Sequence, residues 1–178
     1  MRKAAIVIGA LIALILGSVP LALPAGAGNG PVLTVEPLFR EPMHLVAALD
    51  HDLAATADTA ERALAGNPLL TLDPRHHLAR QAADIAARYG MTIAPDYYGT
   101  SLESLHQMVA SGLGLALLPG LYLHDDTGGA TGLKILSVRG WRVHRSIAIA
   151  WRRQSPMDAA FRLIADHVQA CARRLLAE

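Results

Sequence analysis

GTSLESLHQMVASGLGLALLPG, residues 99–120, is the stretch that decides how this chain folds. Thr100 and Glu103 have the T-x-x-E spacing of a capping box, which predicts the start of a helix. Ser111-Gly112 predicts the end of that helix, because glycine tolerates the left-handed conformation that follows a last helical turn. Residues 113–118 are almost purely apolar, which is typical of a strand buried on both faces of a parallel sheet. The stretch therefore predicts half of an α/β unit.

The composition limits what the rest of the chain can be. The 178 residues have room for one domain and for a sizeable buried core. The net charge is +1, so the overall charge balance does not indicate a nucleic-acid partner. Cys171 is the one cysteine, which excludes a disulfide between two of these residues and excludes any multi-cysteine zinc site.

The first thirty residues have two interpretations. Arg2-Lys3 precedes an apolar run, residues 4–16, and a small-residue stretch ends at Ala25-Gly26-Ala27, which is the pattern of a secretory signal. The apolar run is shorter than the ~20 residues that span a bilayer comfortably. Alternatively, residues 4–9 form a buried parallel strand that ends in a glycine turn, and the chain is an internal piece of a larger domain. Composition alone favours the export signal.

A second strand–loop–helix unit carries the candidate site. Residues 69–72 predict a strand, residues 78–89 predict a helix, and Gly90 ends it. Open α/β sheets bind ligands at the carboxyl ends of their strands, near helix N-termini. The candidate ligand-binding residues are therefore those of the two loops that precede helices: Asp73, Arg75, His76, His77, Thr100 and Ser101. The alternative is that Asp73 only caps the helix, with Pro74 in its first turn and both histidines exposed.

Other elements follow from apolar periodicity and turn residues. We expect the strand at 33–36 to end at Pro37, because proline cannot donate to a ladder. On the final helix, residues 157–176, the apolar positions are Phe161, Ile164, Val168 and Leu175. The remaining predictions are strands at 43–49, 91–93, 133–138 and 146–151, and a short helix or ordered loop within 54–64.

The sequence contains none of the common catalytic or nucleotide-binding motifs, such as a nucleophile elbow or a phosphate-binding loop. Asp50-His51-Asp52 and His124-Asp125-Asp126 contain metal-ligand residue types, but adjacent ligands fit one tetrahedral ion poorly, so solvated turns are the better interpretation. We therefore expect a binding module rather than an enzyme, with no metal and no cofactor.

Four blocks of sequence resemble one family in order and approximate spacing. Residues 100–119 resemble the effector domain of LysR-type transcriptional regulators, in their OxyR-like branch. The other blocks are 35–43, then 69–78, and then 147–156, and the match covers roughly residues 32–178. The resemblance implies an α/β fold of the type-2 periplasmic-binding-protein kind. It also implies two lobes that share a cleft for a small-molecule effector, and a homo-oligomeric regulator. The helix start at Thr100-Ser101 and the neighbouring loop at residues 73–77 favour a small anion as that effector.

The chain departs from that family at the redox loop. The resemblance aligns the peroxide-reacting cysteine with His77 and the resolving cysteine with Ala86 or a neighbour. Cys171 falls in a different element, the final helix. Since a disulfide switch needs a thiolate and a partner thiol, the resemblance implies a ligand-sensing member without a cysteine-based peroxide switch.

The family's helix-turn-helix, its linker helix and most of its first lobe have no counterpart here. We expect residues 1–31 to be a signal-like segment or a remnant strand of the first lobe. Residues 32–145 are then mainly the second lobe, and residues 146–178 are the return strand and final helix of an incomplete first lobe. This favours a truncated cytoplasmic regulator that contacts DNA only through a helix-turn-helix domain absent from the chain. The alternatives are an exported or membrane-associated solute-binding protein of the same fold, and a non-functional fragment.

Overall fold

The computed structural model describes residues 33–124 and 132–176. These residues form two compact units. The first consists of the chain up to Glu41 and from His144 onwards, and the second is Pro42–Val143. The predicted segment 1–31 and residues 125–126 of the predicted polar loop lie outside the described residues. The elements in chain order are β1 (Leu33–Ala48), η1 (Asp52–Ala55), η2 (Glu61–Leu64), β2 (Pro68–Leu72), α2 (His77–Tyr89), β3 (Thr92–Gly99), α3 (Leu102–Ala110), β4 (Leu115–Pro119), α4 (Gly120–Leu123), β5 (Leu133–Ile135), β6 (His144–Arg152) and α5 (Asp158–Leu175).

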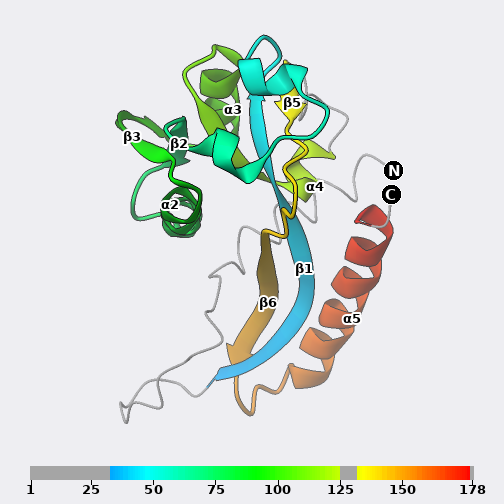
Figure 1. Ribbon diagram of the computed structural model, residues 1–178. Helices are drawn as coiled ribbons and strands as arrows, with labels where there is room; N and C mark the ends of the chain where they lie inside the picture. The colour runs from blue at the N-terminus through cyan, green and yellow to red at the C-terminus, as the bar shows by residue number, and fades with distance from the viewer. Residues whose placement is uncertain (1–32, 125–131, 177–178) are drawn as a thin grey trace. The chain divides into compact units, whose positions relative to one another are not determined.

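The second unit is built on a mixed sheet with the strand order β3-β2-β4-β1-β5. β2 runs parallel to β3 and β4, whereas β1 runs antiparallel to β4 and β5. α2 connects β2 to β3, and α3 connects β3 to β4 (Figure 1). Consecutive strand–helix–strand connections with parallel strands define an α/β unit, so the predicted fold class is confirmed.

The core of this unit lies around β2 and β4. All five residues of β4 are buried, as expected for most of residues 113–118, although one neighbour of β4 is antiparallel. Leu113 is the exception, because it precedes the strand and is 40% exposed. Two buried side chains of α3, Leu105 and Val109, join the same core. The predicted helix ends are also confirmed: Gly90 caps α2 in the left-handed conformation, and Gly112 has φ +77° after α3.

The start of α3 lies one residue later than the predicted capping box. Ser101 is the N-cap, and its hydroxyl accepts a hydrogen bond from the Ser104 backbone N–H at 3.1 Å. The Ser104 hydroxyl in turn accepts from the Ser101 N–H at 3.0 Å. The Thr100–Glu103 assignment is therefore wrong, because a serine three residues after the cap performs the reciprocal role usually given to glutamate.

β1 is one continuous strand, so the predicted break at Pro37 is wrong. A proline removes only one backbone donor from a ladder and is tolerated where that donor has no partner to meet. The Pro37 carbonyl still accepts a hydrogen bond, from Gln169 Nε2 at 2.9 Å. The strand predicted over 133–138 is shorter than expected, since β5 ends at Ile135 and Val138 forms an isolated bridge with Thr59.

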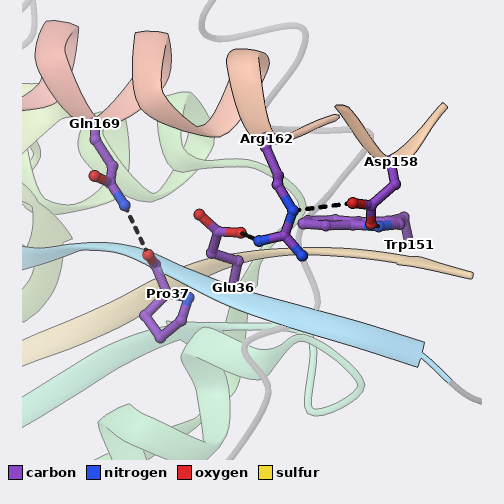
Figure 2. Close-up of polar contacts among 6 residues, drawn as sticks. All are labelled: Glu36, Pro37, Trp151, Asp158, Arg162 and Gln169. Atoms are coloured by element: carbon purple, nitrogen blue, oxygen red, sulfur yellow. Dashed lines mark hydrogen bonds and ion pairs between the residues drawn. The ribbon is translucent and has the colours of Figure 1, made fainter. Parts of the chain in front are cut away.

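In the first unit, α5 packs on β6 and the first part of β1. Trp151 is buried in its core, and its indole donates to Asp158 Oδ1 at 2.8 Å. Figure 2 shows the Arg162 guanidinium between two carboxylates: Asp158 Oδ2 at 2.9 Å and Glu36 Oε2 at 3.4 Å. Arg162 also lies over the Trp151 ring, 5.7 Å from its centroid. These contacts fix the N-terminal half of α5 on the two strands.

The apolar pattern predicted only part of the packed face of α5. Val168 is buried as expected, but Ile164 is 37% exposed. The most buried residues of α5 are Ala165 and Ala172, whose small side chains the apolar pattern did not single out. In the part of the chain that the structure describes, no helix is long and apolar enough to span a bilayer.

Candidate functional site

The candidate site lies at the edge of the sheet where β2 and β3 end. The two strands are parallel, and their last residues, Leu72 and Gly99, are Cα partners. The loop 73–76 therefore leaves the sheet beside Thr100 and Ser101. All six predicted site residues follow one or the other of these paired strand ends, and all lie within the second unit.

An ion pair organises the loop after β2. Both carboxylate oxygens of Asp73 accept hydrogen bonds from the Arg75 guanidinium at 2.9 Å, and Oδ1 also accepts from the Arg75 backbone N–H at 2.9 Å. These hydrogen bonds lower the pKa of Asp73 to about 2. The Arg75 side chain is 91% exposed, so its guanidinium borders solvent.

The histidines begin α2. His76 is the N-cap residue and its exposed side chain makes no capping hydrogen bond, so the alternative in which Asp73 caps the helix is wrong. The Asp73 carboxylate turns to Arg75 instead, and only its backbone carbonyl contacts the helix start, by accepting from the His76 N–H at 2.8 Å. His77, the first residue of α2, is half-buried.

At the start of α3, the serine cap also changes which donors are free to meet a ligand. The backbone N–H groups of Thr100 and Ser101 both donate to Ser104 Oγ, at 2.9 and 3.0 Å. First-turn N–H groups of a helix have no acceptor within the helix. In α3 these first-turn donors include the backbone N–H groups of Leu102 and Glu103, which come directly after the N-cap.

A polar cluster next to this helix start was missed by the sequence analysis. Glu103 accepts from Gln107 Nε2 and from the Tyr122 hydroxyl, each at 3.0 Å, and these bonds lower the pKa of Glu103. Burial, and then the hydrogen bond to Glu103, raise the pKa of Tyr122 to about 12. The Tyr122 oxygen also lies 3.3 Å from Nδ1 of the buried His106. The i,i+4 spacing of Glu103 and Gln107 could have indicated the first contact, but nothing in the sequence indicates Tyr122.

The chemistry of this edge suits anion binding. Cationic or polar side chains and helix-start N–H groups lie there together, a combination that attracts carboxylates and phosphates. In residues 33–124 and 132–176, no three His, Cys, Asp or Glu side chains gather closely enough to hold a metal ion. His51, in the segment Asp50-His51-Asp52, accepts a hydrogen bond from the Leu53 N–H at its Nδ1. It therefore caps η1.

Comparison with known proteins identifies the family. The family model described as LysR substrate binding domain matches residues 9–172. This chain belongs to that family. The predicted resemblance to LysR-type regulators of the OxyR-like branch is thereby confirmed, and the fold is the periplasmic-binding-protein-like fold of their regulatory domains.

Curated proteins similar to this chain include hydrogen peroxide-inducible genes activators and OxyR. The chain is 35% identical over 133 residues to the hydrogen peroxide-inducible genes activator of Pectobacterium carotovorum subsp. carotovorum. It is 33% identical over 134 residues to the DNA-binding transcriptional dual regulator OxyR of Escherichia coli K12. Each match takes 75% of this chain and 44% of the relative, so the chain spans less than half the length of these curated relatives.

Solved structures agree with this family. The reduced form of OxyR has a TM-score of 0.64 at 32% identity, over 78% of this chain and 64% of that chain. The reduced OxyR regulatory domain from Pseudomonas aeruginosa has a TM-score of 0.67 at 26% identity, over 83% of this chain and 69% of that chain. The CcmR regulatory domain of Synechocystis PCC6803, in complex with 2-PG, has a TM-score of 0.65 at 18% identity and shows the shared fold alone.

Proposed function

We propose that this chain is the effector-sensing part of a LysR-type transcriptional regulator and that it binds a small anion where β2 and β3 end. The observation that carries the proposal is the parallel pairing of Leu72 with Gly99, which brings two helix-preceding loops to one edge of the sheet. Family membership supports a regulatory role based on effector binding. The role is one of binding rather than catalysis, in the cytoplasm.

The two loops would contribute different chemical groups to ligand recognition. Arg75, His76 and His77 supply cationic or hydrogen-bonding side chains from the loop and first turn after β2. Thr100 supplies a hydroxyl, and the start of α3 supplies backbone N–H groups at the positive end of the helix dipole. Ser101 contributes through its capping role, which fixes where those N–H groups point.

The cysteine content supports sensing without a peroxide-driven disulfide. The 178 residues contain one cysteine, Cys171. It lies on α5 in the first unit, where its Sγ accepts from the Arg174 guanidinium at 3.3 Å, while the 73–77 loop belongs to the second unit. His77 stands at the position that the family resemblance gives to the reacting cysteine. We therefore propose an effector switch that works by ligand binding alone.

In a complete regulator, the proposed anion would act by favouring one arrangement of an oligomer over another. A ligand shifts such an equilibrium only by its difference in affinity for the two states. DNA contact would come from a helix-turn-helix domain of that complete regulator, and the oligomer would be formed by copies of the same chain.

Calorimetry on the 178-residue chain tests the site. We expect inorganic phosphate or oxalate to bind the wild-type chain, and we expect Arg75→Ala combined with Thr100→Ala to weaken binding at least tenfold. The matched control is Arg80→Ala combined with Thr92→Ala, which removes the same chemical groups from exposed positions on α2 and β3. Equal affinities for the site variant and the control would contradict the assignment.

A further inference from the structure

We propose that Tyr122 is a positioning residue for the anion site: it holds the Glu103 carboxylate away from the N–H groups at the start of α3. This inference rests on the function proposed above, because it concerns the same helix start. It assigns a role in ligand recognition to α4, an element outside the two loops that form the proposed site.

The contacts of Glu103 carry the argument. Glu103 lies in the first turn of α3, yet neither of its carboxylate oxygens turns back to the N-cap. Oε1 accepts from Gln107 Nε2, one turn further along the helix, and Oε2 accepts from the Tyr122 hydroxyl on α4, both at 3.0 Å. Two donors therefore hold the carboxylate on the side away from the helix start.

Without those donors, Glu103 would be an internal competitor of the ligand. A carboxylate in a first turn is attracted by the positive end of the helix dipole, and a glutamate near the cap readily reaches back to backbone N–H groups. A carboxylate at the helix start would neutralise the partial positive charge that attracts an effector anion.

Tyr122 is itself anchored by a buried histidine. A tyrosine hydroxyl carries one proton, and an ionised carboxylate can only accept, so Tyr122 donates its proton to Glu103. The contact between the Tyr122 oxygen and His106 Nδ1, at 3.3 Å, then requires Nδ1–H of His106 to be the donor. His106 is 3% exposed, and its ring meets the Tyr122 ring edge-on with centroids 6.2 Å apart. The tyrosine hydroxyl is thus fixed from the core side.

A double-mutant cycle on the full 178-residue chain tests the inference, with phosphate and oxalate as probes in calorimetry. Tyr122→Phe releases one oxygen of Glu103 and should weaken binding by about 3- to 10-fold, the range expected for one charge–dipole or hydrogen-bond contact. Glu103→Gln alone should bind at least as tightly as the wild type. Tyr122→Phe combined with Glu103→Gln should regain the affinity of Glu103→Gln, because a neutral side chain no longer competes as an anion.

The rescue separates positioning from a merely structural role. If Tyr122→Phe only loosened the fold, removing the charge of Glu103 would not restore binding, and that result would overturn the inference. Unchanged affinity in Tyr122→Phe would overturn it as well. Gln107→Ala releases the other carboxylate oxygen from an exposed position, so it provides the same test if Tyr122→Phe fails to fold. If the wild-type chain binds neither probe, the proposed anion site itself is wrong, and the inference falls with it.

Discussion

Leu72 on β2 and Gly99 on β3 are paired residues of a parallel ladder, and each is the last residue of its strand. Asp73 and Thr100 therefore leave the sheet next to each other. The two loops that begin there bring different groups to one place: an Arg- and His-containing loop after β2, and the capped start of α3 after β3. This relationship makes the edge a better candidate for effector recognition than either loop would be alone.

Asp73→Asn should strengthen anion binding. The Asp73 carboxylate holds the Arg75 guanidinium through two hydrogen bonds, and it is ionised at neutral pH because its pKa is about 2. An effector carboxylate or phosphate must compete with it, so the neutral amide should raise the affinity for oxalate several-fold in calorimetry. Asp84→Asn is the matched control, since it makes the same charge change at an exposed position on α2. Weaker binding by Asp73→Asn would show that Asp73 supports ligand recognition instead.

Ser104→Ala should destabilise the fold by about 1 kcal/mol, the usual cost of losing a helix cap. The Ser104 hydroxyl accepts from two backbone N–H groups, those of Thr100 and Ser101, and donates to the Ser101 carbonyl. Urea denaturation measures the change. Ser111→Ala is the control, because that hydroxyl only donates to the Gln107 carbonyl at the other end of α3, and its removal should cost less. Equal losses would argue against the cap assigned here.

Deprotonation of Tyr122 should lower the free energy of unfolding at high pH. Its pKa rises from 10.0 to about 12 in the folded chain, so the folded state keeps its proton where the unfolded chain loses it. The contribution is complete below pH 10 and is lost as the pH rises from 10 towards about 12. Denaturation midpoints across that range should decline less in Tyr122→Phe than in the wild type. Tyrosinate absorbance during a pH titration should lose its latest-titrating component in the same variant, and persistence of that component would contradict the assignment.

The sequence could predict those parts of the fold that depend on local chemistry. Gly90 and Gly112 are at the helix ends where they were expected, because a left-handed residue there is a local requirement. The burial of β4 follows from its apolar composition. The antiparallel pairing of β4 with β1 could not be predicted, since it depends on a strand about seventy residues earlier in the chain. Similarly, the continuation of β1 through Pro37 could not be predicted, and the Pro37 carbonyl accepts a hydrogen bond from Gln169 of α5, far away in the sequence.

The candidate site was predictable as a set of residues but not as a set of contacts. Asp73 and Arg75 lie in the loop where the sequence placed them, yet their mutual ion pair was not anticipated. Ser101 rather than Thr100 is the N-cap because Ser104 completes the capping box of α3. The box therefore consists of two serines and not of a threonine and a glutamate. Tyr122 reaches Glu103 across 19 residues of sequence, and no periodicity reports such a contact.

Gly114→Ala should be more damaging than Gly66→Ala. Both glycines have positive φ, +156° and +79°, so both substitutions cost roughly 1–3 kcal/mol of backbone strain. A Cβ on Gly114 would also lie 2.7 Å from the Pro68 carbonyl oxygen in the neighbouring strand β2, whereas a Cβ on Gly66 meets nothing within 4 Å. Thermal denaturation should therefore show a larger loss for Gly114→Ala. Comparable losses would mean that β2 and β4 can separate at this point without cost.

An NMR titration of the 178-residue chain with oxalate and with phosphate tests the central claim most directly. If the paired ends of β2 and β3 form the effector site, the amide resonances of residues 73, 75–77 and 100–104 should shift together and saturate at one ligand concentration. The resonances of α5 in the first unit should stay unchanged and serve as the internal control. Saturable shifts confined to residues 158–175, or no saturable shift at 73, 75–77 and 100–104 with either anion, would contradict the account.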